Sequence, residues 1–404
     1  MRLRTLDDLG ELGGARVFVR LDLNVPLRDG AVADDSRIRA SIPTLIELLD
    51  RGASIVAASH LGRPRGKVVE SKRLRPVAGL LREHLGRTVE YVATDGVLSP
   101  EVEQSCEALA FEPGRVVLLE NLRFDPGEEA NDRAFAQRLA GLADAYVDDA
   151  FGAVHRAHAS VAALPQIFKE QGRPVAAGRL LQKEVESLSR LLEDPPRPYV
   201  AILGGAKVSD KCDTIDALIE KVDALLVGGA MAFTFIAERG GSIGKSLVEP
   251  ARFPDVHRAS ARANDLGVIL QLPDDAVAAP EASLDAPRHT VPSAEVPDDQ
   301  MGLDIGPRSV EEFARTIAEA KTVMWNGPMG VYELEPFGAG TRGVATAIAG
   351  TNAFKVVGGG DSLAAVRQLG LEDAFDHRST GGGASLEFLE GHELPGIVVL
   401  QEAA

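Results

Sequence analysis

Short apolar runs recur along the chain, each followed by glycines or a polar turn and then by a segment with helical spacing. In the first half of the chain the runs are Val17–Val25, Ala53–Ser59, Val116–Leu119 and Ala145–Val147. In the second half they are Tyr199–Leu203, Ala224–Val227, Val268–Leu272, Thr322–Trp325 and Phe354–Val357. A buried strand that alternates with an amphipathic helix is the repeating unit of a parallel sheet. The pattern therefore predicts an α/β protein built from parallel βα units.

One helical stretch stands between the two groups of predicted strands. Gly178–Asp194 carries apolar residues at helical spacing, and Pro195, Pro196 and Pro198 end the pattern. A chain of 404 residues is too long for one ordinary core, so two domains are expected. We interpret residues 178–194 as a helix that joins two lobes, residues 1–177 and 195–392. The alternative is a surface helix that belongs to one lobe.

Composition narrows the classes of partner. The formal net charge of −17 argues against general nucleic-acid binding. The stretch Ala224–Ala237 is too short, and too interrupted by glycines, to span a bilayer, and the first residues lack the apolar run of a signal peptide. Cys106 and Cys212 are the only cysteines, which argues against a disulfide framework. We expect a cytoplasmic protein without nucleic-acid or membrane partners.

Four predicted strands of the first lobe end beside a cation or an imidazole. The stretches are VRLDLNVP from Val19, SHLGRP from Ser59, ENLRF from Glu120 and AFGAVHRAHAS from Ala150. Ligands of parallel sheets bind outside the carboxyl ends of the strands, and arginine offers a fork of donors that matches carboxylate and phosphate. We therefore expect a pocket for a small anion that carries both groups. Its residues would be Arg37, His60, Arg63, Arg123 and Arg156, with Asp22 and Asn24 for hydroxyl groups.

Two alternatives apply to these residues. Any one of the arginines, taken alone, is better explained as a solvated surface residue, and only the repetition at four strand ends favours a pocket. His155 and His158 are three residues apart and are able to ligate a metal, but no carboxylate or cysteine motif accompanies them. Anion binding is therefore the favoured interpretation.

The second lobe opens with a strand, two glycines and a helix start that carries two lysines. In PYVAILGGAKVSDKCD, from Pro198, Lys207 and Lys211 are four residues apart and would lie on one helix face, where like charges repel. A bound polyphosphate would turn that repulsion into attraction, helped by the N–H groups of the helix start. The alternative is a pair of solvated lysines beside an ordinary turn.

Further glycine-rich stretches follow other strands of the second lobe, and glycine lets a base or a phosphate approach the main chain. They are VGGAMAFTF from Val227, WNGPMGVYE from Trp325, VGGGDS from Val357 and STGGGAS from Ser379. Glu333 is able to accept hydrogen bonds from a ribose, and Asp361 suits Mg²⁺ beside phosphates, although it also suits an N-cap. The lobe is predicted to bind a nucleotide.

One motif is rejected. Gly244-Lys245-Ser246 resembles the end of a phosphate-binding loop, but that motif needs a glycine five residues before Gly244, where this chain has Arg239. The residues before it also lack the required strand. We interpret the three residues as a coincidence in a loop.

With these motifs in order, the chain closely resembles the phosphoglycerate kinase family almost from end to end. The matching motifs are RLDLNVP, SHLGRP, LENLRF, DAFGAVHRAHAS, GGAKVSDK, WNGPMGVYE, GGGDS and STGGGASLEFLEG. The resemblance implies two Rossmann-like lobes with parallel sheets, joined by a linking helix, with the tail 393–404 packing back on the first lobe. It implies reversible phosphoryl transfer between 1,3-bisphosphoglycerate and ADP, giving 3-phosphoglycerate and ATP, in glycolysis and gluconeogenesis, by a monomer that uses Mg²⁺.

The resemblance also implies roles for individual residues. Those for 3-phosphoglycerate are Asp22, Asn24, Arg37, His60, Leu61, Gly62, Arg63, Arg123 and Arg156. Those for the nucleotide are Lys207, Lys211, Gly228, Gly229, Gly302, Asn326, Glu333, Gly359, Gly360, Asp361 and Ser362, with Asp361 holding the metal. Gly381, Gly382 and Gly383 would cradle a phosphate, and Arg37 and Lys211 would stabilise the phosphoryl group in transfer.

The chain departs from the family pattern at three positions. Ala230 stands where a third glycine is usual, Ser362 replaces a common threonine and Asp148 replaces a common asparagine. Ser362 keeps the hydroxyl group, whereas the methyl group of Ala230 puts the base preference of the nucleotide site in doubt. Two other functions stay open on the residues alone: a kinase for a different acid, and a binding protein without catalysis. A kinase of this design is expected to close around both substrates by hinge bending at the linking helix.

Overall fold

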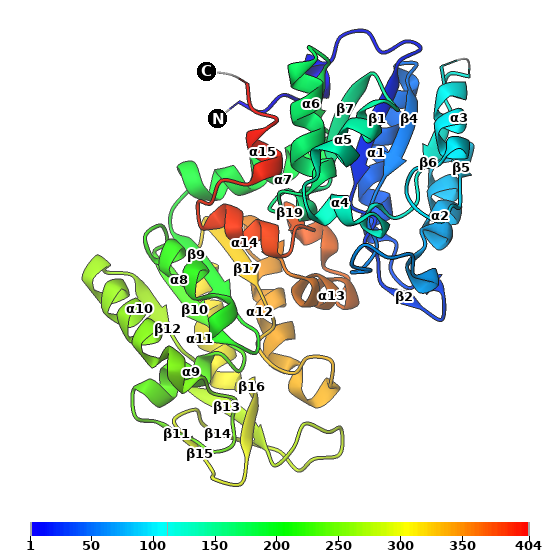
Figure 1. Cartoon of the computed structure of the whole chain (residues 1–404). Helices are drawn as coiled ribbons and strands as arrows, with labels where there is room; N and C mark the ends of the chain where they lie inside the picture. The colour runs from blue at the N-terminus through cyan, green and yellow to red at the C-terminus, as the bar shows by residue number, and fades with distance from the viewer. Residues whose placement is uncertain (1, 111, 403–404) are drawn as a thin grey trace. The chain divides into compact units, whose positions relative to one another are not determined.

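The computed structural model describes residues 2–110 and 112–402 and divides into two units (Figure 1). The first unit runs up to Glu186 and takes in the chain again from Glu393, and the second unit is Ser187–His392. In the described part of the chain, no helix is both long enough and apolar enough to cross a membrane.

The first unit is built on a parallel sheet of six strands in the order β5-β6-β4-β1-β7-β8. The strands are β1 Arg16–Leu21, β4 Ser54–Ala58, β5 Val89–Tyr91, β6 Val116–Leu118, β7 Ala145–Asp149 and β8 Val175–Ala177. The helices are α1 Ser36–Asp50, α2 Arg75–Leu85, α3 Pro100–Ala108, α4 Pro126–Glu129, α5 Arg133–Ala140 and α6 Leu164–Glu170. A short antiparallel pair, β2 Leu27–Arg28 and β3 Ala31–Val32, follows the first strand.

Alternating side chains on β1 fill the two faces of this sheet, since successive residues of a strand point to opposite sides. Val17, Val19 and Leu21 pack in one core cluster with residues of α1 and α2. On the other face, Phe18 stacks on Tyr146 with ring centroids 6.0 Å apart, and Tyr146 contacts Phe168 of α6. Helices therefore cover both faces, which explains why these strands are apolar at nearly every position.

The second unit is built on another parallel sheet of six strands, in the order β12-β10-β9-β17-β18-β19. Its strands are β9 Tyr199–Leu203, β10 Ala224–Val227, β12 Ile269–Gln271, β17 Thr322–Asn326, β18 Phe354–Gly358 and β19 His377–Ser379. The helices are α8 Cys212–Ile219, α9 Ala232–Glu238, α10 Phe253–Leu266, α11 Pro307–Ala318, α12 Ala339–Ala349, α13 Gly360–Gln368 and α14 Gly383–Leu389. Two parallel sheets flanked by helices confirm the predicted α/β fold class.

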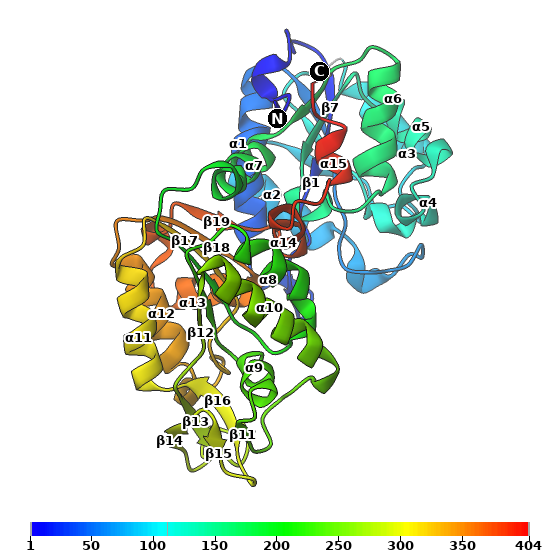
Figure 2. The same cartoon turned by 90° about the vertical axis from the view of Figure 1, so that its left-hand side faces the viewer.

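A small antiparallel sheet departs from the purely parallel pattern predicted for the second unit. It joins β14 His289–Pro292, β13 Asp275–Ala279 and β16 Met301–Ile305, and a second small pair joins β11 Ser242–Ile243 to β15 Glu295–Val296 (Figure 2). β14 is largely exposed and lacks the continuous apolar run that marks the parallel strands. The sequence pattern missed this sheet because antiparallel strands of four or five residues give a weak periodic signal.

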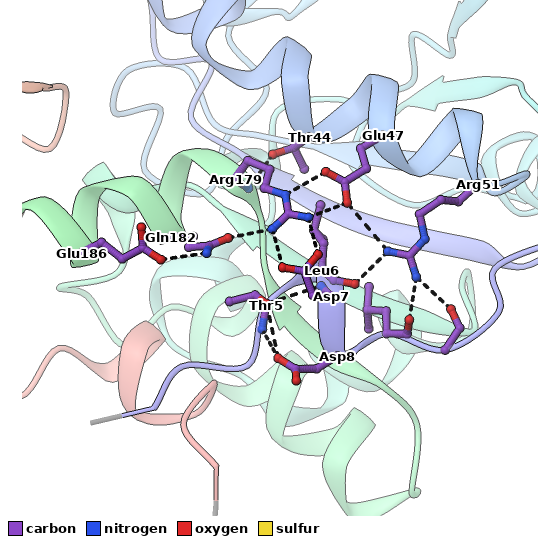
Figure 3. Close-up of polar contacts among 12 residues, drawn as sticks. Thr5, Leu6, Asp7, Asp8, Thr44, Glu47, Arg51, Arg179, Gln182 and Glu186 are labelled. Atoms are coloured by element: carbon purple, nitrogen blue, oxygen red, sulfur yellow. Dashed lines mark hydrogen bonds and ion pairs between the residues drawn. The ribbon is translucent and has the colours of Figure 1, made fainter.

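The predicted linking helix is α7 Arg179–Glu193, and its first turn is tied to the first unit by polar contacts (Figure 3). Thr44 Oγ1 accepts the N–H of Arg179 at 2.8 Å. The Arg179 guanidinium donates to Glu47 Oε2 at 2.7 Å and to Asp7 Oδ1 at 2.6 Å. The division between the units falls inside this helix, after Glu186.

The end of the described chain packs on the first unit. The N–H of Gly396, in α15 Pro395–Val398, donates to Val154 O at 2.9 Å. The N–H of Arg4 donates to Leu400 O at 3.0 Å, so the first and last described residues lie side by side. Leu400 is completely buried. The apolar end of the sequence thus belongs to the core of the first unit.

Candidate functional site

Four neighbouring strands of the first unit, β6, β4, β1 and β7, bring the candidate anion-binding residues to one edge of the sheet. Asp22 follows β1, His60 follows β4, and Arg156 follows β7. Arg123 lies in a 3₁₀ turn, Leu122–Phe124, that follows β6. Parallel strands end at the same edge, so the fold collects side chains that are far apart in the sequence.

Contacts between these residues shape the site. Arg37, in the first turn of α1 as the sequence predicts, forms an ion pair with the buried carboxylate of Asp22. Asn24 Oδ1 accepts the N–H of Gly62 at 2.8 Å, and the Arg123 guanidinium donates to Gly62 O at 2.8 Å. Hydrogen bonds within the protein therefore join the loops that follow β1, β4 and β6.

His60 is neutral in this environment. Burial, together with Arg20, Arg123 and Arg37, lowers the pKa of His60 well below its usual value. Its Nδ1 lies 3.1 Å from a guanidinium nitrogen of Arg20, which is able only to donate. Nδ1 is therefore the acceptor, and Nε2 carries the proton. His60 is thus a neutral hydrogen-bond donor, and the positive charge of the site comes from arginines.

The remaining basic candidates differ in exposure. Arg123 is buried, and burial with the neighbouring Arg20 lowers its pKa to about 10, so it stays protonated at neutral pH. Arg156 is half-buried and donates from Nε to Nε2 of His155 at 3.3 Å. His158 is buried, and burial lowers its pKa to about 4. Arg63 is exposed.

Sequence reasoning missed a buried polar group beneath this site. Arg20 is completely buried in β1 and donates from Nε to Ser160 Oγ at 2.9 Å. Glu128 is also completely buried and accepts the N–H and the hydroxyl of Ser160 at 3.0 and 2.6 Å. A charged residue inside an otherwise apolar strand, as in VFVRL, is the signal by which Arg20 could have been found.

Asp148, one of the departures from the family pattern, is completely buried at the end of β7. Its Oδ2 lies 3.0 Å from the Tyr146 hydroxyl, which also lies 2.8 Å from Ser160 O. One hydroxyl has a single proton for these two acceptors, so a protonated acid or an amide at position 148 satisfies the group better than a carboxylate. Burial raises the pKa of Asp148 to about 6, against the opposing influence of the Ala150 N–H and Arg20, while Asp22 adds to the rise.

We therefore expect Asp148→Asn to stabilise the first unit above pH 6. The unfolded pKa is near 3.8 and the folded pKa is about 6, so the folded state binds more protons between these values and the parent chain loses stability as pH rises through them. The gain should be small at pH 4 and reach about 2 kcal/mol at pH 7.5. Denaturant unfolding across this range measures it. Asp50→Asn, at a position with 61% side-chain exposure, is the control, and a gain that does not change with pH would contradict the explanation.

The second unit contains a cavity of about 360 Å³ at the carboxyl ends of its strands. Its walls combine main chain with apolar side chains, and Asp361 and Glu333 supply carboxylates. The lining includes Gly205, Gly229, Ala230, Phe233, Leu247, Met301, Gly302, Leu303 and Asp304. A nearly apolar slot with a few polar groups at its mouth suits a flat base attached to a polar group.

Two glycines in this lining have no room for a side chain. A Cβ on Gly302 would lie 2.0 Å from Cζ of Phe233, so the ring packs directly on the main chain. Gly229 has φ +66°, and a Cβ there would lie 2.6 Å from the N of Gly205. Gly228 packs instead against Met329. Ala230 lines the cavity, so the methyl group that puts base preference in doubt does face this space.

Lys211 is held at the end of β17. Its ammonium group donates to Asn326 O at 2.8 Å and to Asn326 Oδ1 at 2.6 Å. Burial lowers the pKa of Lys211 to about 8, against the opposing influence of Asp361 and Asp210. With this pKa Lys211 is still largely protonated at neutral pH, and an anionic ligand beside it would favour the charged form further.

The other nucleotide candidates follow the carboxyl ends of β9, β17, β18 and β19. Asp361 is in the first turn of α13, whose N-cap is Gly359, so the alternative role of Asp361 as an N-cap is wrong. The Ser362 hydroxyl is buried and accepts the N–H of Gly327 at 2.7 Å, a structural bond that the sequence did not reveal. Lys207 and Glu333 are exposed. Gly360 precedes Asp361, and Gly381 and Gly382 precede α14, which begins at Gly383.

Asp304 is a further cavity residue that sequence reasoning missed. Its buried carboxylate accepts the N–H of Ile305 at 3.0 Å and the N–H of Gly340 at 2.7 Å. Burial raises the pKa of Asp304 to about 7, although these N–H groups oppose the rise. The residue joins β16 to the start of α12 and so fixes one wall of the cavity. Nothing in its local sequence distinguishes it from an exposed aspartate.

Fold and site together define a class: an α/β protein with one anion-binding sheet edge and one cavity of the kind that holds nucleotides. The profile of the phosphoglycerate kinase family matches residues 6–392. The phosphoglycerate kinase of Moorella thermoacetica is 53% identical over 398 residues, covering 98% of this chain and 99% of that protein. That of Thermus thermophilus is 52% identical over 400 residues, covering 99% of this chain and all of that protein.

Solved structures with a similar fold belong to the same family. The phosphoglycerate kinase from Coxiella burnetii matches with a TM-score of 0.86 and 40% identity, covering 99% of each chain. That from Pyrococcus horikoshii matches with a TM-score of 0.84 and 30% identity, covering 98% of each. The chain belongs to the phosphoglycerate kinase family, and it is a kinase with a carboxyl group as acceptor.

Proposed function

We propose that this chain transfers a phosphoryl group reversibly between 1,3-bisphosphoglycerate and ADP, giving 3-phosphoglycerate and ATP, in glycolysis and gluconeogenesis. The observation that carries the proposal is the pair of sheet edges: arginines and a neutral histidine in the first unit, a glycine-walled cavity and Lys211 in the second. Family membership gives the reaction, and these two edges give each substrate a matching set of groups. The proposed setting is the cytoplasm, and the proposed state is a monomer.

In the first unit, the proposed 3-phosphoglycerate site uses different groups for the two ends of the ligand. Arg63, Arg123 and Arg156 offer guanidinium groups to the phosphate, and His60 donates a neutral hydrogen bond. Asp22 and Asn24 face the hydroxyl and carboxylate end, close to Arg37. Leu61 and Gly62 supply the main chain of the loop.

In the second unit, the proposed nucleotide site is the cavity and the turns around it. Gly229 and Gly302 line the pocket for the base and let Gly205 and Phe233 pack against their main chain, and Gly228 belongs to the same site. Glu333 accepts from the ribose. Lys207, Lys211 and Asn326 surround the phosphates together with the helix start at Gly359, Gly360 and Ser362. Gly381, Gly382 and Gly383 offer a further cradle of N–H groups for the transferred group.

Catalysis in this proposal depends on positioning and charge. A carboxylate acceptor is already ionised at neutral pH, so the reaction needs no general base. The barrier falls when the reacting oxygen is held in line with the phosphorus atom and the developing charge is neutralised. Arg37 and Lys211 perform this neutralisation. The carboxylate of Asp22 holds Arg37, and two oxygens of Asn326 hold Lys211.

The residues present fit a Mg²⁺ ion that arrives with the nucleotide. Among the described residues, no group of three or more histidine, cysteine, aspartate or glutamate side chains is placed to hold a metal ion. Asp361 offers one exposed carboxylate at the mouth of the cavity, and Mg²⁺ typically binds through one or two carboxylates plus phosphates and water. When bound, the ion would neutralise phosphate charge.

Asp361→Asn is therefore expected to weaken nucleotide binding only when Mg²⁺ is present. Replacing the anionic ligand by an amide should raise the Kd of MgADP about 10-fold, because one charged ligand of the metal is lost. Without Mg²⁺ the Kd of ADP should stay the same or fall slightly, because a repulsive charge has gone. Isothermal titration with and without Mg²⁺ measures both, and an unchanged Kd for MgADP would contradict the assignment.

Turnover tests the proposed function directly. ATP consumption by the purified chain should depend on 3-phosphoglycerate. Alternative hydroxy acids, offered in the same coupled assay, test the rival kinase for a different acid. ATP consumption with another acid but not with 3-phosphoglycerate would overturn the proposed substrate, and no turnover with any acid would favour a binding protein.

A further inference from the structure

The segment 242–249, which contains Gly244-Lys245-Ser246, is not a phosphate-binding loop, but it contacts both the lining of the cavity and the turn that carries the two lysines. It begins with β11 and leads to the 3₁₀ turn Pro250–Arg252. In the middle of the segment the Ser246 hydroxyl is buried and accepts the N–H of Gly302 at 2.9 Å. Leu247 lines the cavity. This part of the segment therefore supports the wall against which the base is proposed to lie.

The other end of the segment contacts the turn that carries the two lysines. Glu249 Oε2 accepts the N–H of Ser209 at 2.9 Å, and Glu249 Oε1 accepts the Ser209 hydroxyl at 2.7 Å. Ser209 is the central residue of the 3₁₀ turn Val208–Asp210, which stands between Lys207 and Lys211. One carboxylate thus makes two hydrogen bonds to the residue midway between the lysines.

Glu249 is itself fixed in place. Its N–H donates to the hydroxyl of Thr234 at 3.2 Å, and Thr234 is buried in α9. Burial by itself would raise the pKa of Glu249, yet the Ser209 N–H and hydroxyl, the Val208 N–H and Lys207 together hold it below its usual value. The side chain is therefore a carboxylate at neutral pH that accepts from the lysine turn, and the main chain of the same residue is anchored to α9.

A carboxylate at this place is electrostatically costly if the site holds a polyphosphate. Neither the N-cap of α8, Lys211, nor that of the 3₁₀ turn, Lys207, makes a side-chain cap hydrogen bond. A neutral side chain at either N-cap would accept from N–H groups of the turn without repelling an anion. This chain instead has a full negative charge beside the turn: the Glu249 carboxylate attracts Lys207 and accepts two hydrogen bonds from Ser209. Its role is therefore one that a neutral cap would not fill.

We propose that Glu249 is a positioning residue for nucleotide phosphates. It fixes the Val208–Asp210 turn so that Lys207 and Lys211 are presented together, and through segment 242–249 it links that turn to the wall of the base cavity. The inference rests on the proposed function, because it assigns the phosphates to these two lysines.

Two ligands distinguish the effect of a variant on base binding from its effect on phosphate binding. ADP reports the base and phosphate ends together, whereas adenosine reports the base end alone. In Glu249→Ala the Kd of ADP should rise about 10-fold, since the turn between two phosphate-binding cations is released. The Kd of adenosine should change less than about 2-fold, because the Ser246–Gly302 bond remains. Titration calorimetry without Mg²⁺ measures both ligands.

Three further variants make the result specific. Glu249→Gln keeps one acceptor oxygen and should recover part of the ADP affinity. Ser209→Ala removes only the hydroxyl bond and should reproduce a smaller loss, which keeps the test valid if Glu249→Ala fails to fold. Ser246→Ala acts at the base end and should weaken ADP and adenosine by the same factor.

Lys211→Ala separates the failure of this inference from failure of the proposed function. If Lys211→Ala weakens ADP but not adenosine while the Glu249 and Ser209 variants bind ADP normally, the positioning role is wrong and the nucleotide site stands. If the Glu249 variants weaken ADP and adenosine equally, Glu249 only stabilises the fold, and the inference is also overturned. If Lys211→Ala leaves ADP binding unchanged, the phosphate assignment itself fails.

Discussion

Replacing Arg37 with alanine is expected to lower kcat about 10³-fold while changing the Kd of 3-phosphoglycerate less than about 10-fold. A guanidinium that meets the phosphoryl group only during transfer stabilises the transition state more than the bound substrate. In the structure Arg37 lies in the first turn of α1, paired with the buried Asp22 at the end of β1. Its position is set before any substrate binds.

The ion pair between Arg37 and Asp22 also predicts how the substitution affects substrate binding. Removing Arg37 leaves a buried carboxylate without its partner, which should weaken the binding of an anionic substrate moderately. Arg37→Lys keeps the charge but not the planar fork and should recover only part of the lost rate. Steady-state kinetics at saturating ATP, with equilibrium titration of 3-phosphoglycerate, measures the two effects separately.

A matched control lies on the same helix. Arg39 has a side-chain exposure of 57% and pairs with Asp35 in the i, i+4 arrangement. Arg39→Ala should leave kcat and the Kd of 3-phosphoglycerate within about 2-fold of the parent values, as expected for an exposed pair. A rise in KM for Arg37→Ala with unchanged kcat at saturation would show that Arg37 only binds the substrate.

Deleting the residues after Pro395 is expected to destabilise the first unit by about 3–6 kcal/mol and the second unit much less. The deleted segment includes Ile397 and Leu400, both buried in the first unit. It also removes the hydrogen bonds from Gly396 to Val154 and from Arg4 to Leu400, and the bond from Lys169 Nζ to Val399 O at 3.0 Å. Apolar burial and main-chain pairing are therefore lost together.

Hydrogen exchange resolved along the chain measures this prediction, because protection should fall in strands of the first sheet and persist in those of the second. Two point variants distinguish loss of packing from a general effect of truncation. Leu400→Ala should cost about 2–5 kcal/mol, whereas Val398→Ala, at a position 41% exposed, should cost less than about 0.5 kcal/mol. Equal loss of protection in both units would contradict docking of the tail on the first.

Much of the fold was predictable because parallel strands bury both faces. The predicted runs Tyr199–Leu203 and Ala224–Val227 coincide with β9 and β10. The run Val17–Val25 was predicted too long, since β1 ends at Leu21 and the chain turns out of the sheet at Asp22. Short strands such as β5 and β19 were missed because polar residues interrupt them, as in VEY and HRS, whereas the equally short β6 reads VVL and was predicted.

The residues of the candidate sites were predictable for a related reason. The carboxyl end of each parallel strand is readable from the apolar run before it, so Asp22, His60 and Lys211 stood out by position alone. The protonation states of these side chains, by contrast, could not be predicted from the sequence. His60 is neutral because the fold buries it and because Arg20, which donates to it from within the sheet, adds a positive charge beside it. Lys211 has a pKa of about 8 because the fold buries it.

By itself, the sequence determined the class of fold, the places where ligands would meet each sheet, and the family. These depend on local patterns: apolar runs, glycines after strands and motifs of a few residues. The tertiary structure alone decided which groups are charged, which are paired, and what supports them from a distance. Glu249 accepts hydrogen bonds from Ser209, forty positions away. Asp148 and the carbonyl oxygen of Ser160 both accept from the Tyr146 hydroxyl. Such contacts depend on packing that no local pattern encodes.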